Sequence, residues 1–250
     1  MIRGMSYPKG VFYMDREHIA HATITKDGNI ATTLLPFGTE GLWFFIKRTC
    51  FTLPIYFIVG LIFTTLWIWK QPGFPFYFLL LVGFGYHFVF PYPLKQYHGA
   101  EHKVFSYQGK KTMEALEAVR SSNIVNRNCS TNNVITFYLL FLLGYYPLGG
   151  NGAACLGLIG VWAIPRFLKP IDQKIIFPIS AYFQRHVTTV EPETRHLKAA
   201  LLSYISLNRK EAVNEEMLLE EQRMDKEKLR LQKLHEERER ILKETEYLEI

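Results

Sequence analysis

Residues 51–69 read FTLPIYFIVGLIFTTLWIW and contain no charged side chain. A helix needs about 20 predominantly apolar residues, with a lower limit of roughly 17, to cross a bilayer. Residues 74–90 (FPFYFLLLVGFGYHFVF) also meet this limit without a charge. Charge-free runs of this length are unusual in the core of a soluble protein, so we expect both stretches to be transmembrane helices.

Two shorter apolar stretches follow, over residues 134–146 and 153–164. The glycine-rich sequence PLGGNG separates them, and each reaches spanning length when neighbouring uncharged residues are included. The sequence therefore predicts a mainly α, polytopic helical membrane protein, with about four transmembrane helices arranged as two hairpins. A small N-terminal β-hairpin element and a long C-terminal charged helix complete the expected fold.

Lysines and arginines collect in the three long segments around these hairpins, while the two short turns contain only Lys70 between them. By the positive-inside rule, the long segments and both termini are expected in the cytoplasm of a multi-pass cell-membrane protein. The expected partner of the basic residues is the lipid bilayer, and no nucleic acid is predicted. The three cysteines, an odd number, suit a reducing compartment.

The composition divides the chain into successive segments. In the first, threonine and isoleucine stand on either side of Asp27-Gly28, a dipeptide that favours a tight hairpin turn. The expected segments are a cytoplasmic β-hairpin segment (1–50), a first transmembrane hairpin (51–90), a cytoplasmic loop (91–133), a second transmembrane hairpin (134–165), a cytoplasmic or interfacial segment (166–207) and a charged helical tail (208–250).

The tail, residues 208–250, has ten lysines and arginines against thirteen acids and no glycine or proline. Met217, Met224 and Leu231 follow seven-residue steps, as in a coiled coil, but charged residues such as Glu220 and Glu227 interrupt the alternate seam positions. Two interpretations stay open: a solvated single helix, or a helix that binds a protein partner.

The loop before the second hairpin contains KQYHGAEHKVF at residues 95–105, with the pattern His-x-x-Glu-His. On a helix, His98 and His102 would extend from successive turns of one face and could bind one metal ion. Glu101 would lie beside the ion, where it could deprotonate a bound water. This is the arrangement of the inverted zincin motif, so zinc is the expected metal and Glu101 the expected catalytic base.

A zinc site of this kind needs a third protein ligand. Cys129 is the first choice, because a thiolate binds zinc strongly. Four glutamates are eligible by residue type: Glu114, Glu117, Glu191 and Glu193. In the competing interpretation the motif binds no metal, and Glu101 pairs with Lys103, Lys95 or Arg127. His87, inside the second apolar stretch, is either functional or hydrogen-bonded to a neighbouring helix.

Several strings resemble the YqhQ-like family: YHGAEHK at residues 97–103, RNCST at 127–131, TTVEP at 188–192 and RGM at 3–5. The resemblance covers about residues 1–207. It implies a multi-spanning bacterial membrane protein, of a family of largely unknown function whose members are described as predicted metal-dependent enzymes. The chain departs from the family where Asn126 and Ser130 replace a histidine and a glycine, and an amide is a poorer zinc ligand than imidazole.

Two functions are therefore predicted. One is a metal-dependent hydrolase at the cytoplasmic membrane face, with His98 and His102 as ligands, Glu101 as base and Cys129 or a downstream glutamate completing the shell. The other is a non-enzymatic scaffold or assembly factor that recruits a partner through residues 208–250. The departure at Asn126 favours the scaffold, whereas the intact HGAEH favours the hydrolase. A homo-oligomer is compatible with both.

Overall fold

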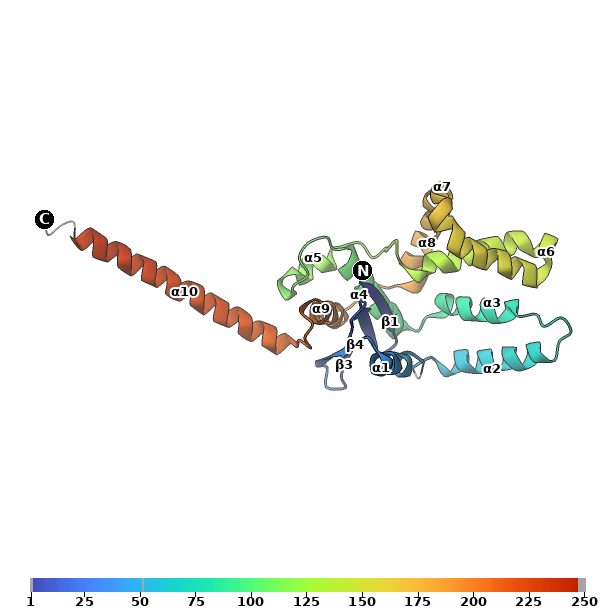
Figure 1. Ribbon diagram of the computed structural model, residues 1–250, viewed down its shortest axis with the longest axis horizontal. Helices are drawn as coiled ribbons and strands as arrows, with labels where there is room; N and C mark the ends of the chain where they lie inside the picture. The colour runs from blue at the N-terminus through green and yellow to red at the C-terminus, as the bar shows by residue number, and fades with distance from the viewer. Residues whose placement is uncertain (1, 51, 247–250) are drawn as a thin grey trace. The chain divides into compact units, whose positions relative to one another are not determined.

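The computed structural model describes residues 2–50 and 52–246, with side chains described as far as residue 238. The chain divides into two units, Met1–Ala212 and Val213–Ile250, each of which is considered by itself. The protein is mainly helical, with 68% helix, and has a small N-terminal antiparallel sheet (Figure 1). The mainly α fold class with an N-terminal β element is confirmed.

The sheet is an antiparallel meander in the order β1-β2-β3-β4. Its strands are Arg3–Tyr7 (β1), Gly10–Met14 (β2), His18–Ile24 (β3) and Ile30–Pro36 (β4). The turn between β3 and β4 places Gly28 at a φ of 83°, a left-handed conformation that glycine adopts without steric cost. The hairpin predicted at Asp27-Gly28 is confirmed, and β1 and β2 extend it.

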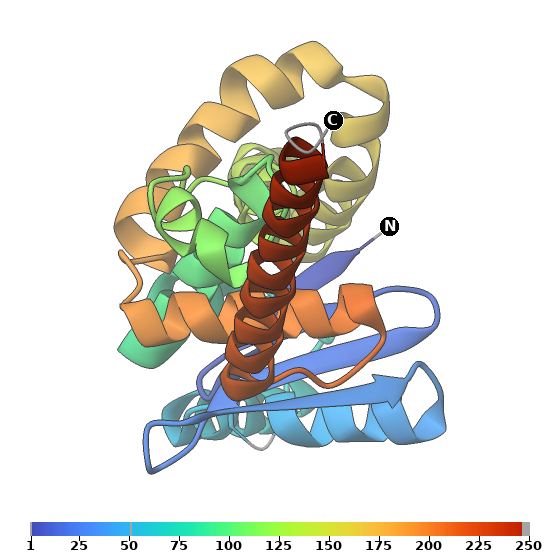
Figure 2. The ribbon, with the colours of Figure 1, turned by 90° about the vertical axis from the view of Figure 1, so that its left-hand side faces the viewer.

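Helices cover both faces of the sheet. Successive residues of a strand point to opposite faces, so the ring of Phe12 packs against Phe45 of α1 (Thr39–Cys50). Tyr13 packs on the other face against Phe105 of α4 (Tyr92–Ser106) and Tyr204 of α9 (Thr194–Arg209). Figure 2 shows α9 lying over the strands. The motif-bearing helix α4 is therefore part of the core of this unit.

The first predicted transmembrane hairpin is a pair of antiparallel helices. α2 (Ile55–Trp69) packs against α3 (Tyr77–Gly85), which continues into the 3-10 helix η1 (Tyr86–Val89). Ring contacts near both ends fix the register: Trp67 with Phe78 at 4.9 Å and Phe57 with Tyr86 at 4.4 Å between centroids. In Figure 1 the two helices lie side by side, and Phe51 is outside the described residues.

The second predicted hairpin corresponds to α6 (Ser130–Phe167), whose helical backbone breaks at Gly149 with φ 66° and ψ 173°. Two arms fold back on each other at this point, because a Cβ added to Gly157 would meet Phe137 and one added to Gly144 would meet Ala153. The break falls within PLGGNG, where only glycine adopts such a positive φ without steric cost. The predicted helix–turn–helix arrangement is therefore present.

Length and composition give a more limited result for membrane crossing. Among the described residues, α6 is the one helix that is by itself long and apolar enough to span a bilayer, judged by length and composition over both of its arms. Two bent pairs pass the same test when each is counted as one span, α1 with α2 at 95° and α3–η1 with α4 at 80°. The predicted membrane association is compatible with one to three spans of this kind. The prediction of four separate transmembrane helices is not supported by length and composition alone.

Shorter helices close the first unit. η2 (Met113–Ala115) and α5 (Leu116–Arg120) follow α4, and residues 169–188 are helical with two π turns: α7 (Lys169–Ile171), η3 (Asp172–Ile176), α8 (Phe177–Phe183) and η4 (Gln184–Thr188). Ile176 packs with Ile135 and Ile164 of α6 in a buried cluster. This segment therefore helps to bury the inner side of α6.

The second unit consists mainly of α10 (Glu215–Glu246). Asn214 begins this helix by accepting a hydrogen bond from the Met217 amide at 2.8 Å. Met217, Met224 and Leu231 are all exposed, as are the charged residues around them. The predicted tail helix is present, and its heptad positions are free of packing within the described side chains.

Candidate metal centre

Helix α4 contains the whole His-x-x-Glu-His pattern. Pro93 stands in its first turn, where a missing amide hydrogen costs no hydrogen bond. His98, Glu101 and His102 are all buried, and the ring centroids of the two histidines are 4.3 Å apart. The condition on which the metal-site prediction depends is therefore met: the motif is helical and both imidazoles lie on one face.

Cys129 is brought to these histidines by the start of α6. It is the N-cap of that helix, and its Sγ accepts a hydrogen bond from the Thr131 amide at 3.4 Å. The His98 Nε2 and Cys129 Sγ atoms are 3.2 Å apart. One ligand atom from each of His98, His102 and Cys129 lies within 4.8 Å of the others. We call these three residues the His-His-Cys cluster.

Hydrogen bonds determine which nitrogen each histidine can offer to an ion. His102 Nδ1 donates to the Ile124 carbonyl at 2.6 Å, so Nε2 is the nitrogen left with a lone pair in neutral His102. His98 Nδ1 is 2.9 Å from the hydroxyl of Ser6 in β1, and its Nε2 faces Cys129. Partners of this kind orient metal-ligating histidines and increase their basicity.

Glu101 lies beside the cluster and connects to it through Ser6. The Ser6 hydroxyl hydrogen-bonds to the Glu101 carboxylate and lowers its pKa, but burial has the larger effect and raises that pKa to about 7. Glu101 Oε2 is buried without a hydrogen-bond partner. A buried carboxylate oxygen without a partner is costly, and a cation or a water beside it would satisfy it.

Burial also keeps the cluster neutral in the metal-free protein. It lowers the pKa of His102 to about 4, and together with His102 and His87 it holds the pKa of His98 well below its usual range. Burial raises the pKa of the Cys129 thiol to about 11. The imidazoles are therefore already in the form that binds metal, whereas Cys129 must lose a proton on binding.

Three of the four glutamates considered as third ligands form ion pairs elsewhere, and Glu114 is not among the residues grouped around the histidines. Glu191 pairs with Lys103 at 2.7 Å, Glu193 with Arg195 at 2.7 Å and Glu117 with Arg120 at 3.5 Å. Cys129 is the candidate that joins the histidines within the described residues. The alternative pairing of Glu101 with Lys103, Lys95 or Arg127 is not observed among the described residues: Lys103 pairs with Glu191, Arg127 pairs with Asp172, and Glu101 Oε2 has no partner.

The two departures from the YqhQ-like pattern leave the cluster intact. The Asn126 amide donates to Gln184 Oε1 at 2.8 Å, and its side-chain oxygen accepts from the Asn128 amide at 2.9 Å. Asn126 therefore shapes the turn before α6. The Ser130 hydroxyl is 3.0 Å from Nε2 of His87, which gives His87 a hydrogen-bonding partner on a neighbouring helix.

The sequence did not reveal the residues that orient the cluster. Ser6 is 92 positions from His98, and Ile124 contributes only its backbone carbonyl, which carries no sequence signal. Gly99, the small residue inside the motif, is visible in the sequence, and the structure shows why a small residue is needed there. A Cβ there would collide with the Val190 carbonyl, so glycine lets α4 approach this segment closely.

The donors fit a zinc ion. Imidazole and thiolate are the ligands that zinc prefers, and two histidines with one cysteine make a three-ligand set that leaves a fourth position for water or substrate. The oriented Nε2 of His102 and the unpartnered Glu101 Oε2 are both compatible with a metal ion held by these residues.

These features define a mainly helical protein with a buried His-His-Cys cluster that could hold a metal ion. The model of a family described as a protein of unknown function (DUF1385) matches residues 50–210, and the chain belongs to this family. The match agrees with the expected uncharacterised family but does not carry the YqhQ-like name. Comparisons with curated proteins and with solved structures find no match.

Proposed function

We propose that this protein is an integral membrane metal-dependent hydrolase whose centre is the His-His-Cys cluster, at the cytoplasmic end of two helical hairpins. The hydrogen bond from His102 Nδ1 to the Ile124 carbonyl carries this proposal, because it directs Nε2 toward the space shared with His98 and Cys129.

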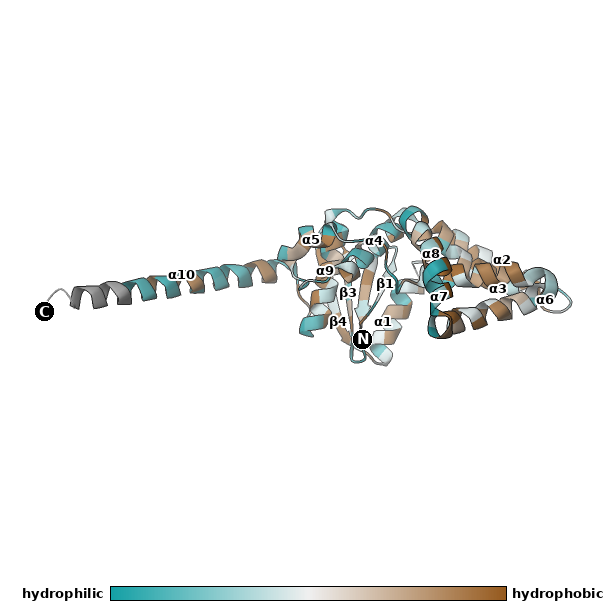
Figure 3. Cartoon of the chain, turned by 90° about the horizontal axis from the view of Figure 1, so that it is seen from above, coloured by the Kyte–Doolittle hydropathy of each residue, from teal (hydrophilic) through white to brown (hydrophobic). Residues whose placement is uncertain are grey.

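Exposed apolar side chains support the membrane assignment. Ile55, Phe63 and Trp69 of α2 are 73%, 69% and 81% exposed, and Leu143 of α6 is 73% exposed. Figure 3 shows hydrophobic residues along α2, α3 and α6. A surface of this kind is stable only in an apolar solvent or against a partner. Each arm of α6 has roughly 18 residues and a length of about 27 Å, close to the thickness of a bilayer core.

The chain's own residues have distinct roles in the proposed reaction. A zinc ion held by His98, His102 and Cys129 would polarise the scissile group and lower the pKa of a water molecule. The water oxygen adds to the electrophilic carbon or phosphorus atom, and Glu101 accepts the proton that water releases. Glu101 then returns this proton to the leaving group as its bond breaks. Ser6, between Glu101 and His98, holds the base next to the ligands.

The test is the metal content of the full-length protein, purified in detergent without chelator and measured by elemental mass spectrometry. We expect near-stoichiometric zinc in the parent and at least a tenfold loss in the His98→Ala, His102→Ala double variant. His186→Ala is the matched control, because His186 is exposed and outside the cluster. Cys129→Ser is compared with Cys155→Ser, an exposed free cysteine. A metal-free parent would refute the proposal.

Glu101→Gln separates a catalytic base from a fourth ligand. As a base, Glu101 can be replaced with the metal content unchanged, while cellular function falls by the factor of about 10² to 10⁴ typical of general bases. If Glu101 is instead a metal ligand, Glu101→Gln should lose the metal as well as the cellular function. The protein level should stay constant, and truncation after Leu207 should be tolerated in either case.

A second candidate function is recruitment of a protein partner by the tail. The observation in its favour is that Val213–Ile250 forms a unit of its own, with Met217, Met224 and Leu231 exposed on its helix. Exposed apolar residues at seven-residue spacing are suited to binding another helix. This function predicts the opposite pattern: truncation after Leu207 abolishes cellular function, and Glu101→Gln leaves it intact.

A further inference from the structure

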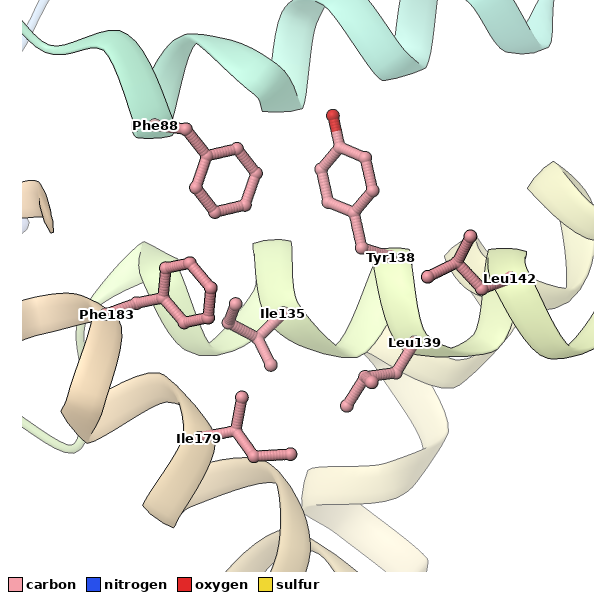
Figure 4. Close-up of a pocket in the computed structure, with 7 residues that line it drawn as sticks. All are labelled: Phe88, Ile135, Tyr138, Leu139, Leu142, Ile179 and Phe183. Carbon is pink, nitrogen blue, oxygen red and sulfur yellow. The ribbon is translucent and has the colours of Figure 1, made fainter.

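A cleft of about 390 Å³ lies among η1, the first arm of α6 and α8. Figure 4 shows Phe88, Ile135 and Phe183 at one end and Leu142 at the other. Tyr138 is the one lining residue with a polar side-chain atom, and its hydroxyl donates to the Leu81 carbonyl at 2.6 Å. The cleft therefore offers no free polar group and suits a hydrocarbon ligand.

The Leu142 end of the cleft continues into the apolar outer surface of the hairpins. Leu142 is 68% exposed, and Leu143 beside it is 73% exposed. In the proposed membrane orientation this surface faces lipid, so a hydrocarbon chain can enter the cleft from the bilayer without crossing water. This continuity favours a membrane lipid over a water-soluble ligand or a peptide.

The other end of the cleft approaches the His-His-Cys cluster. Ile135 comes six residues after Cys129 on the same helix, which corresponds to about 9 Å. Phe88 follows His87, whose Nε2 is 3.0 Å from the Ser130 hydroxyl. His87 Nδ1 is buried without a hydrogen-bond partner, and the ring of Phe90 lies 5.7 Å from that of His98. A polar pair thus stands between the apolar cleft and the cluster.

We infer that the cleft holds the hydrocarbon chain of an amphipathic lipid whose polar end reaches His87, Ser130 and the metal centre. This inference rests on the proposed hydrolase function and assigns its substrate class, a lipid with a hydrolysable bond at its polar end. The helical rise of about 9 Å between Cys129 and Ile135 sets the scale of the distance that the polar end has to cover from the cleft.

The first measurement counts bound lipid on the full-length protein by native mass spectrometry, with palmitoyl-oleoyl phosphatidylglycerol as the probe. Leu139→Trp fills the cleft, and we expect it to weaken binding at least tenfold. Leu143→Trp adds the same volume to the same helix outside the cleft and should change binding less than twofold. Ile179→Trp repeats the test from α8 in case the first variant folds poorly. Equal binding by the variants and their control would overturn the inference.

The second measurement connects the cleft to the cluster. Cobalt replaces zinc in the purified protein, and the visible absorption of the ion is recorded during lipid addition. We expect the lipid to change this spectrum in the parent and not in Leu139→Trp. Lipid that binds without affecting cobalt would refute the assignment as substrate. The double variant His98→Ala, His102→Ala should still bind lipid, so a failure of the metal proposal can be distinguished from a failure of the cleft proposal.

Discussion

Helices α2 and α4 have the same length, 15 residues, but their burial is opposite. α2 is almost entirely apolar and buries only Ile68, whereas α4 contains two histidines, a glutamate and two lysines and buries ten residues. An apolar helix is exposed only where the solvent is apolar, and polar groups are buried only where partners compensate their lost hydration. The comparison supports the proposed function, in which lipid surrounds the apolar hairpins and protein partners surround the buried polar residues of α4.

The largest expected effect tests whether α2 is surrounded by lipid. Phe63, near the middle of α2, is 69% exposed. An arginine at the centre of a transmembrane helix costs about 3 kcal/mol on the insertion scale, so Phe63→Arg should reduce insertion roughly a hundredfold. The measurement is the insertion of α2 itself, monitored by labelling of Lys70→Cys with a membrane-impermeant thiol reagent, because the arms of α6 would hold the protein in the membrane in either case. Leu231→Arg in α10 is the control, and unchanged labelling in Phe63→Arg would exclude a lipid environment for α2.

The next effect concerns a buried polar group of the sheet. Burial, with a contribution from Arg48, lowers the pKa of His21 to about 3. Below about pH 6.5 the unfolded chain binds a proton at His21 that the folded protein does not bind, so stability decreases as the pH falls. By pH 5 this amounts to about 2 kcal/mol, at about 1.4 kcal/mol per pH unit.

His21→Gln removes this proton uptake and can keep a hydrogen bond to the Tyr7 hydroxyl, which is 2.7 Å from His21 Nε2. The loss of unfolding free energy between pH 7.5 and pH 5 should therefore be smaller by about 2 kcal/mol in this variant. Guanidinium unfolding at both pH values, in detergent, gives this difference. His186→Gln, at an exposed histidine outside the sheet, is the control. An unchanged dependence in His21→Gln would show that His21 is protonated in the folded protein.

A smaller effect is expected from the residue that orients His98. Ser6→Ala removes the hydroxyl that is 2.9 Å from His98 Nδ1. Loss of such a partner reduces metal affinity about 10- to 100-fold, and we expect the lower value because His102 keeps its bond to Ile124. Competition with a chromophoric zinc chelator measures the affinity. Ser121→Ala, at an exposed serine, is the control. Equal zinc affinities of Ser6→Ala and Ser121→Ala would show that Ser6 does not contribute to metal binding.

The smallest effect concerns the β3–β4 turn. Gly28 has a φ of 83°, so Gly28→Ala should destabilise the protein by about 1 kcal/mol. Gly38→Ala is the control, since Gly38 also has open space around its Cα and needs no positive φ. Thermal unfolding should distinguish the two variants. Equal melting temperatures would indicate that this turn relaxes without cost.

The sequence by itself determined the local features of this protein. Charge-free apolar runs, Asp27-Gly28, PLGGNG and the i, i+4 spacing of His98 and His102 each act within a few residues, where backbone sterics and hydrophobic periodicity decide the structure. The hairpin turns and the tail helix could therefore be predicted, whereas the helical conformation of the motif was only a condition of the metal-site prediction.

Only the tertiary structure decided which distant groups meet. Cys129 was one of five eligible third ligands by type, and the fold selected it by placing the start of α6 against α4. Ser6 and the Ile124 carbonyl came from a strand and a loop with no motif of their own. Contacts across such separations depend on how the sheet and helices pack. Packing involves the whole core, so it cannot be predicted from a pattern of a few residues.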